Sequence, residues 1–176
     1  MKNNAPYYLT AITLFLLLKF GFTFAGNDNL AFLLKPVDKL VCLITGSSSV
    51  YFPDRGYFHD QLQIVIDKSC SGFNFWLICF LMLTFLLLKQ AGKPVQKGRI
   101  LPLALAGAYV FTIFVNTSRI IAAVVIQNQA IHFLPAKIYL ILHQSVGIVV
   151  YLTFLILIYF LIEKYLNKRQ SHEKST

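Results

Sequence analysis

The sequence predicts an all-α polytopic membrane protein with about four transmembrane helices and an extracytoplasmic segment that carries an interfacial amphipathic helix. The first observation is composition: the chain is 57% hydrophobic and only 13% charged, outside the usual range of soluble domains. The second is that apolar residues gather in long runs, where only a helix satisfies the backbone within lipid. The third is that basic residues flank these runs, as orientation signals do, rather than forming one patch for nucleic acid.

Four apolar runs are long enough to cross a bilayer. We predict helices at residues 6–24, 72–88, 100–121 and 138–162, all within a single domain that covers residues 1–176. The first run has the small-residue ending of a signal peptide. Its apolar stretch is nevertheless of spanning length, so we expect it to remain as a membrane helix.

The segment 29–46, "NLAFLLKPVDKLVCLITG", is apolar on one side only. Its leucine, valine and isoleucine residues follow helical spacing, while Lys35, Asp38 and Lys39 occupy the other side and Pro36 interrupts. This pattern is typical of an amphipathic helix lying in the membrane interface rather than of a span.

Charge asymmetry predicts the orientation. The N-terminus, the segment 89–99 and the C-terminal tail are basic, and four spans place all three on one side, which the positive-inside rule makes cytoplasmic. The other side holds five of the seven acidic residues, namely Asp28, Asp38, Asp54, Asp60 and Asp67. We therefore expect a multi-pass protein of the cytoplasmic membrane with both termini inside and the segment 26–71 outside.

Three cysteines are an odd number without metal-ligand spacing. We therefore expect no disulfide framework, no zinc site and no other cofactor. Cys42 and Cys79 are predicted to be packing residues. Cys70, in "DKSCSGFNFW", is different because it stands at the outer mouth of the second span.

Two other polar residues are predicted at the depth of Cys70. Arg119 lies near the outer end of the third span, and His143 lies about one turn inside the outer end of the fourth. An arginine at mid-membrane costs roughly 2.5–3.5 kcal/mol by insertion scales, and less near the interface, so Arg119 should meet a polar group within the bundle. Three helices thus bring Cys70, Arg119 and His143 to one level.

This trio suits nucleophilic acyl transfer. A thiolate at Cys70 attacks a carbonyl, His143 moves the proton, and Arg119 stabilises negative charge on sulfur and on the tetrahedral oxyanion. Gly72 would allow a substrate backbone to come close to the thiol. Asn116 shares a helix face with the arginine and either orients the guanidinium or bonds a neighbouring helix.

The motifs "SCSGFNF" at Ser69–Phe75, "NTSRI" at Asn116–Ile120 and "HQSVG" at His143–Gly147 resemble those of the exosortase/archaeosortase family, and the short chain resembles its small exosortase K branch. The resemblance runs from roughly residue 29 to 159. It implies a membrane-embedded bacterial cysteine protease or transpeptidase that cleaves C-terminal sorting signals (PEP-CTERM-like) of exported proteins outside the cytoplasmic membrane. It also implies catalytic roles for the cysteine, arginine and histidine, and membrane-tethered proteins as partners. Larger members of that family have about twice as many spans as this chain.

Other interpretations stay open. The chain could be a non-enzymatic accessory subunit of an export or polysaccharide assembly system, in which the polar residues are structural. Ser69 or Ser71 could be the nucleophile of a rhomboid-like serine protease, although a thiolate is the more readily formed nucleophile. His59 or His132 could replace His143 as the base. A transporter would need broken helices and charge at mid-bilayer, which the spans do not clearly show.

Overall fold

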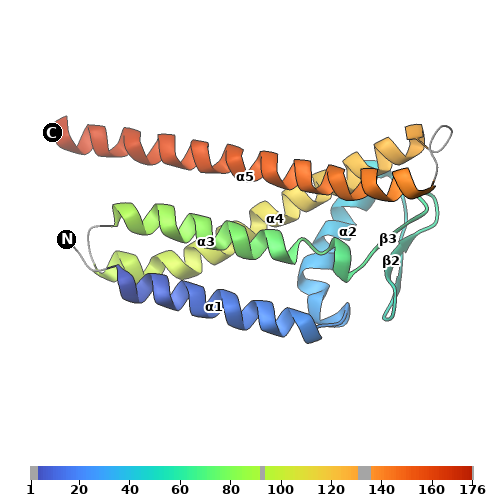
Figure 1. Ribbon diagram of the computed structural model, residues 1–176, viewed down its shortest axis with the longest axis horizontal. Coiled ribbons are helices and arrows are strands. Elements are labelled where there is room, and N and C mark those ends of the chain that lie inside the picture. The colour runs from blue at the N-terminus through green and yellow to red at the C-terminus, as the bar shows by residue number, and fades with distance from the viewer. Residues whose placement is uncertain (1–3, 92–93, 131–135, 176) are drawn as a thin grey trace.

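The computed structural model describes residues 4–91, 94–130 and 136–175, without side-chain detail for residues 94, 128–130, 136–144 and 169–175. Helices dominate, and a small antiparallel sheet lies at one end of the bundle (Figure 1). The elements are α1 (Ala5–Phe24), η1 (Asp28–Leu30), α2 (Ala31–Thr45), β1 (Val50–Phe52), β2 (Gly56–His59), β3 (Ile64–Ile66), η2 (Lys68–Cys70), α3 (Phe73–Gln90), α4 (Pro94–Ala130) and α5 (Ala136–Ser175).

Within the described residues, four helical segments are long and apolar enough to cross a membrane: Ala5–Phe24, Lys68–Gln90, Val95–Gln127 and Ser145–Lys168. These correspond to the four predicted runs, and the architecture is that of a multi-pass membrane protein. The last two helices extend beyond the spans predicted for them. α4 and α5 have 37 and 40 residues, because helical hydrogen bonding continues through polar sequence beyond each apolar run.

The two described ends of the chain lie at the same end of the bundle, opposite the sheet (Figure 1). At this end, the side-chain amide of Asn4 donates a hydrogen bond to the carbonyl of Leu88, at 3.0 Å. Lys97 also bonds Asn4. That lysine belongs to the segment 89–99 predicted as a loop, but it sits in α4 and is only 4% exposed. The geometry thus agrees with an even number of crossings, while the loop is shorter than predicted.

α4 is the central helix, since it packs against α2, α3 and α5. Ala104 and Ala108 are buried on it, and such small residues let neighbouring helices approach closely. α1 packs against α3, where the rings of Phe22 and Phe73 stack with centroids 4.5 Å apart. The core therefore lies between α3 and α4 and extends along α2.

α2 is the amphipathic helix predicted at 29–46, but it packs on α4 rather than only lying in an interface. Its apolar face is buried, namely Leu33, Leu34, Val37 and Val41. Pro36 inside the helix has no N–H, so the carbonyl four residues earlier, on Phe32, loses its helical donor. The hydroxyl of Tyr109 from α4 supplies that missing hydrogen bond at 2.7 Å, which explains how the proline is tolerated.

The three-stranded sheet, in the order β1-β2-β3, is an addition to the all-helical prediction. In the β2–β3 ladder Tyr57 pairs with Ile66 and His59 pairs with Ile64. Gly56 has φ +92°, and a Cβ there would lie 2.4 Å from the carbonyl oxygen of Ile66. The close approach at this glycine holds β3 in place directly before the segment that carries Cys70.

Candidate active site

The chain between β3 and α3 is a tight turn built around Asp67. Its carboxylate accepts hydrogen bonds from the backbone N–H and the hydroxyl of Ser69, at 2.9 and 2.6 Å. The backbone N–H of Cys70 donates to the carbonyl of Asp67 at 2.9 Å. These bonds fix the position of the thiol before α3 begins.

A lysine ties the same turn to the end of α1. The Lys68 ammonium donates to the carbonyls of Ala25 and Thr23, at 2.7 and 3.2 Å, where a helix C-terminus leaves acceptors without partners. Its backbone N–H donates to the side chain of Asn27 at 2.9 Å. The turn is therefore anchored on one side by α1 and on the other by α4.

Gly72 is the point where α4 packs closely against the cysteine turn. It has φ +71°, and a Cβ there would lie 3.1 Å from both Asn116 Cγ and Thr112 Cγ2. The missing side chain therefore makes room for α4 on the Cβ side of this residue, while Gly72 also lines a cavity with Ser69, Ser71 and Tyr151.

Asn116 connects the cysteine turn to the arginine. It is fully buried, and its amide donates to the carbonyl of Cys70 at 2.5 Å. Its side-chain oxygen accepts from the hydroxyl of Tyr151 at 2.6 Å. The same hydroxyl accepts from a guanidinium N–H of Arg119 at 3.3 Å. Both roles considered for Asn116 are thus present, one directly and one through Tyr151.

The Arg119 guanidinium lies over the Tyr151 ring, 5.3 Å from its centroid, a cation–π arrangement. Arg119 also lines a cavity together with Cys70. Gly147 of α5 makes room for it, since a Cβ there would lie 2.8 Å from Arg119 Nε. The arginine is therefore held from α5, and it meets a polar group within the bundle, as its predicted depth requires.

Cys70 and Arg119 share a cavity of about 300 Å³. One wall is formed by β3 and the residue before it, namely Gln63, Ile64, Val65 and Ile66. The other wall is the part of α4 that follows Arg119, namely Ile120, Ala123, Val124 and Gln127. A second cavity of about 470 Å³ lies against the other side of the turn, lined by residues from α1, the turn, α3 and Tyr151. A thiol and a planar set of N–H donors thus line one mostly apolar cavity, an arrangement that acyl transfer could use.

The side chain of His143 and all of His132 lie outside the described residues. The main chain of His143 lies in α5, one helical turn before Gly147. His59 is fully buried and its two ring nitrogens contact Asp38 and Ser47, at 3.0 and 2.9 Å. It does not line the Cys70 cavity, so the structure does not support it as the base.

The alternative serine nucleophiles have other partners. The Ser69 hydroxyl donates to Asp67 at 2.6 Å. Ser71 is 1% exposed, and its oxygen accepts from the backbone N–H of Phe73 at 3.3 Å. Both hydroxyls therefore shape the turn, and Cys70 is the residue of "SCSG" that lines the cavity with Arg119.

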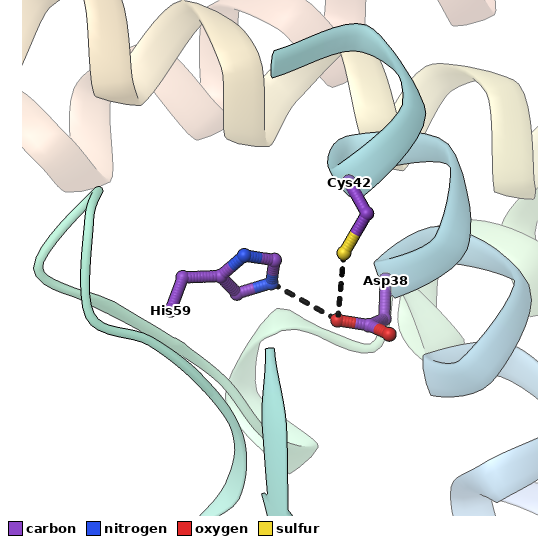
Figure 2. A group of neighbouring side chains, drawn as sticks. All are labelled: Asp38, Cys42 and His59. Carbon is purple, nitrogen blue, oxygen red and sulfur yellow. Dashed lines mark hydrogen bonds and ion pairs between the residues drawn. The ribbon is translucent and has the colours of Figure 1, made fainter. Parts of the chain in front are cut away.

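Sequence reasoning missed Tyr151, although it lies four residues after Gly147 and so on the same helix face. It also missed a second polar cluster, in which Asp38, Cys42 and His59 gather between α2 and β2 (Figure 2). Cys42 therefore has polar neighbours that a packing residue would lack. Cys79 is fully buried in the core, as predicted.

Comparison of the chain with protein-family models, with curated proteins and with solved structures finds no match. The resemblance to exosortases stays a prediction from the three motifs.

Proposed function

We propose that the protein is a membrane-embedded cysteine peptidase or transpeptidase that cleaves the C-terminal tails of exported, membrane-tethered proteins. The observation that carries the proposal is the shared cavity of Cys70 and Arg119, with the arginine held by Tyr151 and Asn116. The motif resemblance to exosortases supports the same chemistry.

In the proposed reaction the Cys70 thiolate attacks the carbonyl carbon of the scissile peptide bond. The guanidinium of Arg119 donates to the resulting oxyanion. His143 takes the thiol proton and gives it to the leaving amine as the C–N bond breaks. The product is a thioester on Cys70, which water or an amine then resolves, releasing the thiol.

The orientation belongs to the same proposal. With the basic N-terminus and C-terminal tail in the cytoplasm, the sheet and the Cys70 cavity face outward. A cavity at this level reaches a peptide bond only next to a membrane span. Substrates are therefore proteins anchored by a C-terminal apolar stretch with a basic end.

The proposal is tested by processing of a reporter that carries a PEP-CTERM-type tail, co-expressed with the enzyme in membranes. Cys70→Ala should abolish processing, and Cys79→Ala, which removes a buried thiol remote from the cavity, should preserve it. Arg119→Lys keeps the charge but loses the planar fork, and loss of one oxyanion donor typically costs about 100- to 1,000-fold in rate. His143→Ala should be similarly damaging, whereas His132→Ala should not.

The geometry of the reporter supplies a second test. Moving the scissile motif roughly ten residues from its apolar stretch should abolish cleavage, because an extended chain of that length spans about 33–36 Å. Undiminished cleavage of that reporter, or wild-type processing by Cys70→Ala, would count against the proposal. Labelling of a cysteine introduced at Lys168 from outside intact cells would overturn the orientation.

A further inference from the structure

Three side chains with metal-binding atoms converge where α2 meets β2. The Asp38 carboxylate lies 3.0 Å from His59 Nε2 and 3.9 Å from Cys42 Sγ. All three ligand atoms lie within 4.8 Å of one another. Figure 2 shows the imidazole ring and the sulfur approaching the same carboxylate oxygen from two sides.

This cluster is poorly arranged for nucleophilic catalysis. In a Cys–His–Asp triad the histidine stands between the thiol and the carboxylate, so that it can take the thiol proton. Here Asp38 stands between Cys42 and His59. The histidine is also fully buried and the aspartate is 6% exposed, which leaves little access for a peptide substrate.

We propose that Asp38, Cys42 and His59 bind a divalent transition metal ion, with Zn²⁺ as the best match. A zinc ion holds nitrogen, oxygen and sulfur donors at about 2.0–2.3 Å in a tetrahedron, so neighbouring donors lie about 3.3–3.7 Å apart. The two separations that involve Asp38, 3.0 and 3.9 Å, bracket that range, and the third, between the sulfur and the imidazole, is within 4.8 Å. The fourth position falls to water or to the Ser49 hydroxyl, which is 3.8 Å from the Cys42 sulfur.

The chemistry of the donors supports a metal. A carboxylate and a thiolate together balance the two positive charges of the ion, so the buried set becomes neutral, and an imidazole with a thiolate favours zinc over magnesium or calcium. Metal-bound histidines usually donate their second ring N–H to an oxygen acceptor. His59 Nδ1 meets this condition, since it lies 2.9 Å from the hydroxyl of Ser47.

The site would join the sheet to the helical bundle. Asp38 and Cys42 lie on α2, which packs against α4, while His59 lies on β2. In the ladder His59 pairs with Ile64 of β3, and Ile64 lines the Cys70 cavity. A metal ion here would therefore fix the strand that forms one wall of that cavity. It is a structural role that does not depend on the proposed peptidase activity.

The test uses the full-length protein in detergent without a polyhistidine tag, stripped with a chelator and titrated with Zn²⁺ or Co²⁺. We expect one ion per chain by elemental analysis, and a thiolate-to-cobalt charge-transfer band with Co²⁺. Ser47 would be an outer-sphere partner of the metal, and loss of such a partner typically lowers metal affinity about 10- to 100-fold. Ser47→Ala should lower the Zn²⁺ affinity by that factor. Cys42→Ser and His59→Gln, which remove direct ligands, should lower it at least as much.

Cys70→Ser and Cys79→Ala are the matched thiol controls and should bind the metal as the wild type does. Helix content by circular dichroism and elution as one species show that each variant is folded. A wild-type protein that takes up no stoichiometric metal would overturn the proposal and leave the cluster as a hydrogen-bonded link. So would a charge-transfer band that persists in folded Cys42→Ser, because the thiolate would then come from another residue.

Discussion

Replacing Gly72 by alanine should destabilise the protein clearly more than the same replacement of Gly46. The two glycines have the same left-handed backbone, with φ +71° and +70°. At Gly46 a Cβ would meet nothing within 4 Å, whereas at Gly72 it would lie 3.1 Å from Asn116 Cγ and from Thr112 Cγ2. The pair therefore separates backbone strain from the packing of α4 on the cysteine turn.

The magnitudes follow from these two contributions. An L-residue in the left-handed region costs about 1–2 kcal/mol, which is the whole effect expected at Gly46. Overpacking of a close contact adds about 1–3 kcal/mol, so Gly72→Ala should cost about 2–5 kcal/mol. For a chain of 176 residues, about 1 kcal/mol shifts Tm by roughly 2–4 °C. The two variants should differ by about 2–12 °C.

The assay is thermal denaturation of the detergent-solubilised protein, followed by circular dichroism. One fixed scan rate is needed because unfolding of a membrane protein is often irreversible. Equal shifts for Gly72→Ala and Gly46→Ala, or a larger shift for Gly46→Ala, would refute the close contact between the cysteine turn and α4.

Three further predictions concern particular contacts. Tyr109→Phe should cost about 1 kcal/mol in the free energy of unfolding, because it removes the donor to the carbonyl freed by Pro36; in a Pro36→Ala background, where a backbone N–H returns, a double-mutant cycle should show a smaller cost. Gly147→Ala should lower the processing rate strongly and Tm only slightly, because the new Cβ displaces the flexible guanidinium of Arg119 rather than backbone. A large fall in Tm that accompanies the loss of processing would contradict this. The hydrogen bond that Tyr51 donates to Asp28 raises the pKa of Tyr51 from 10.0 to about 12. The small contribution of this bond to stability is therefore complete below pH 10 and is lost as the pH rises through 12. An ultraviolet titration of tyrosinate should show that Asp28→Asn lowers this pKa toward 10.

The membrane helices are the part of the fold that local sequence predicts best. Each span is visible in the sequence as a continuous apolar run, and in lipid such a segment forms a helix because its backbone groups must hydrogen-bond to one another. The ends are predicted less well, because a helix can continue into polar sequence when its backbone bonds are already made. Lys97 is an example. The charge pattern places it in a loop, whereas in the structure it is a buried residue of α4 that bonds Asn4.

The sheet was missed although its signal was present. Two aromatic stretches, 50–52 and 57–59, flank "PDRG", and a proline, an aspartate and a glycine between apolar stretches predict a turn. The cluster of Asp38, Cys42 and His59 was harder to predict. The four-residue spacing of the first two places them on one helix face, but the histidine joins them only through the register of the strands.

The convergence of Cys70 and Arg119 on one cavity could be predicted, because the order of the spans places both residues toward the same end of the bundle, although α4 continues beyond Arg119 to Ala130. Their connection through Tyr151 and Asn116 could not, since it depends on how α4 and α5 pack. The close packing at Gly72 could not be predicted either, because the sequence shows that a side chain is missing and only the structure shows that Asn116 and Thr112 lie where it would be.

In the proposed reaction the Cys70 sulfur becomes acylated by the substrate. Membranes that contain the protein and a tail-bearing reporter can be quenched in acid, and the protein can then be mapped by mass spectrometry. A thioester on the peptide containing Cys70, removed by neutral hydroxylamine and missing in Cys70→Ser, is the predicted result. An acyl group on Ser69 or Ser71 that resists hydroxylamine, or continued cleavage of the reporter by Cys70→Ala, would contradict the account.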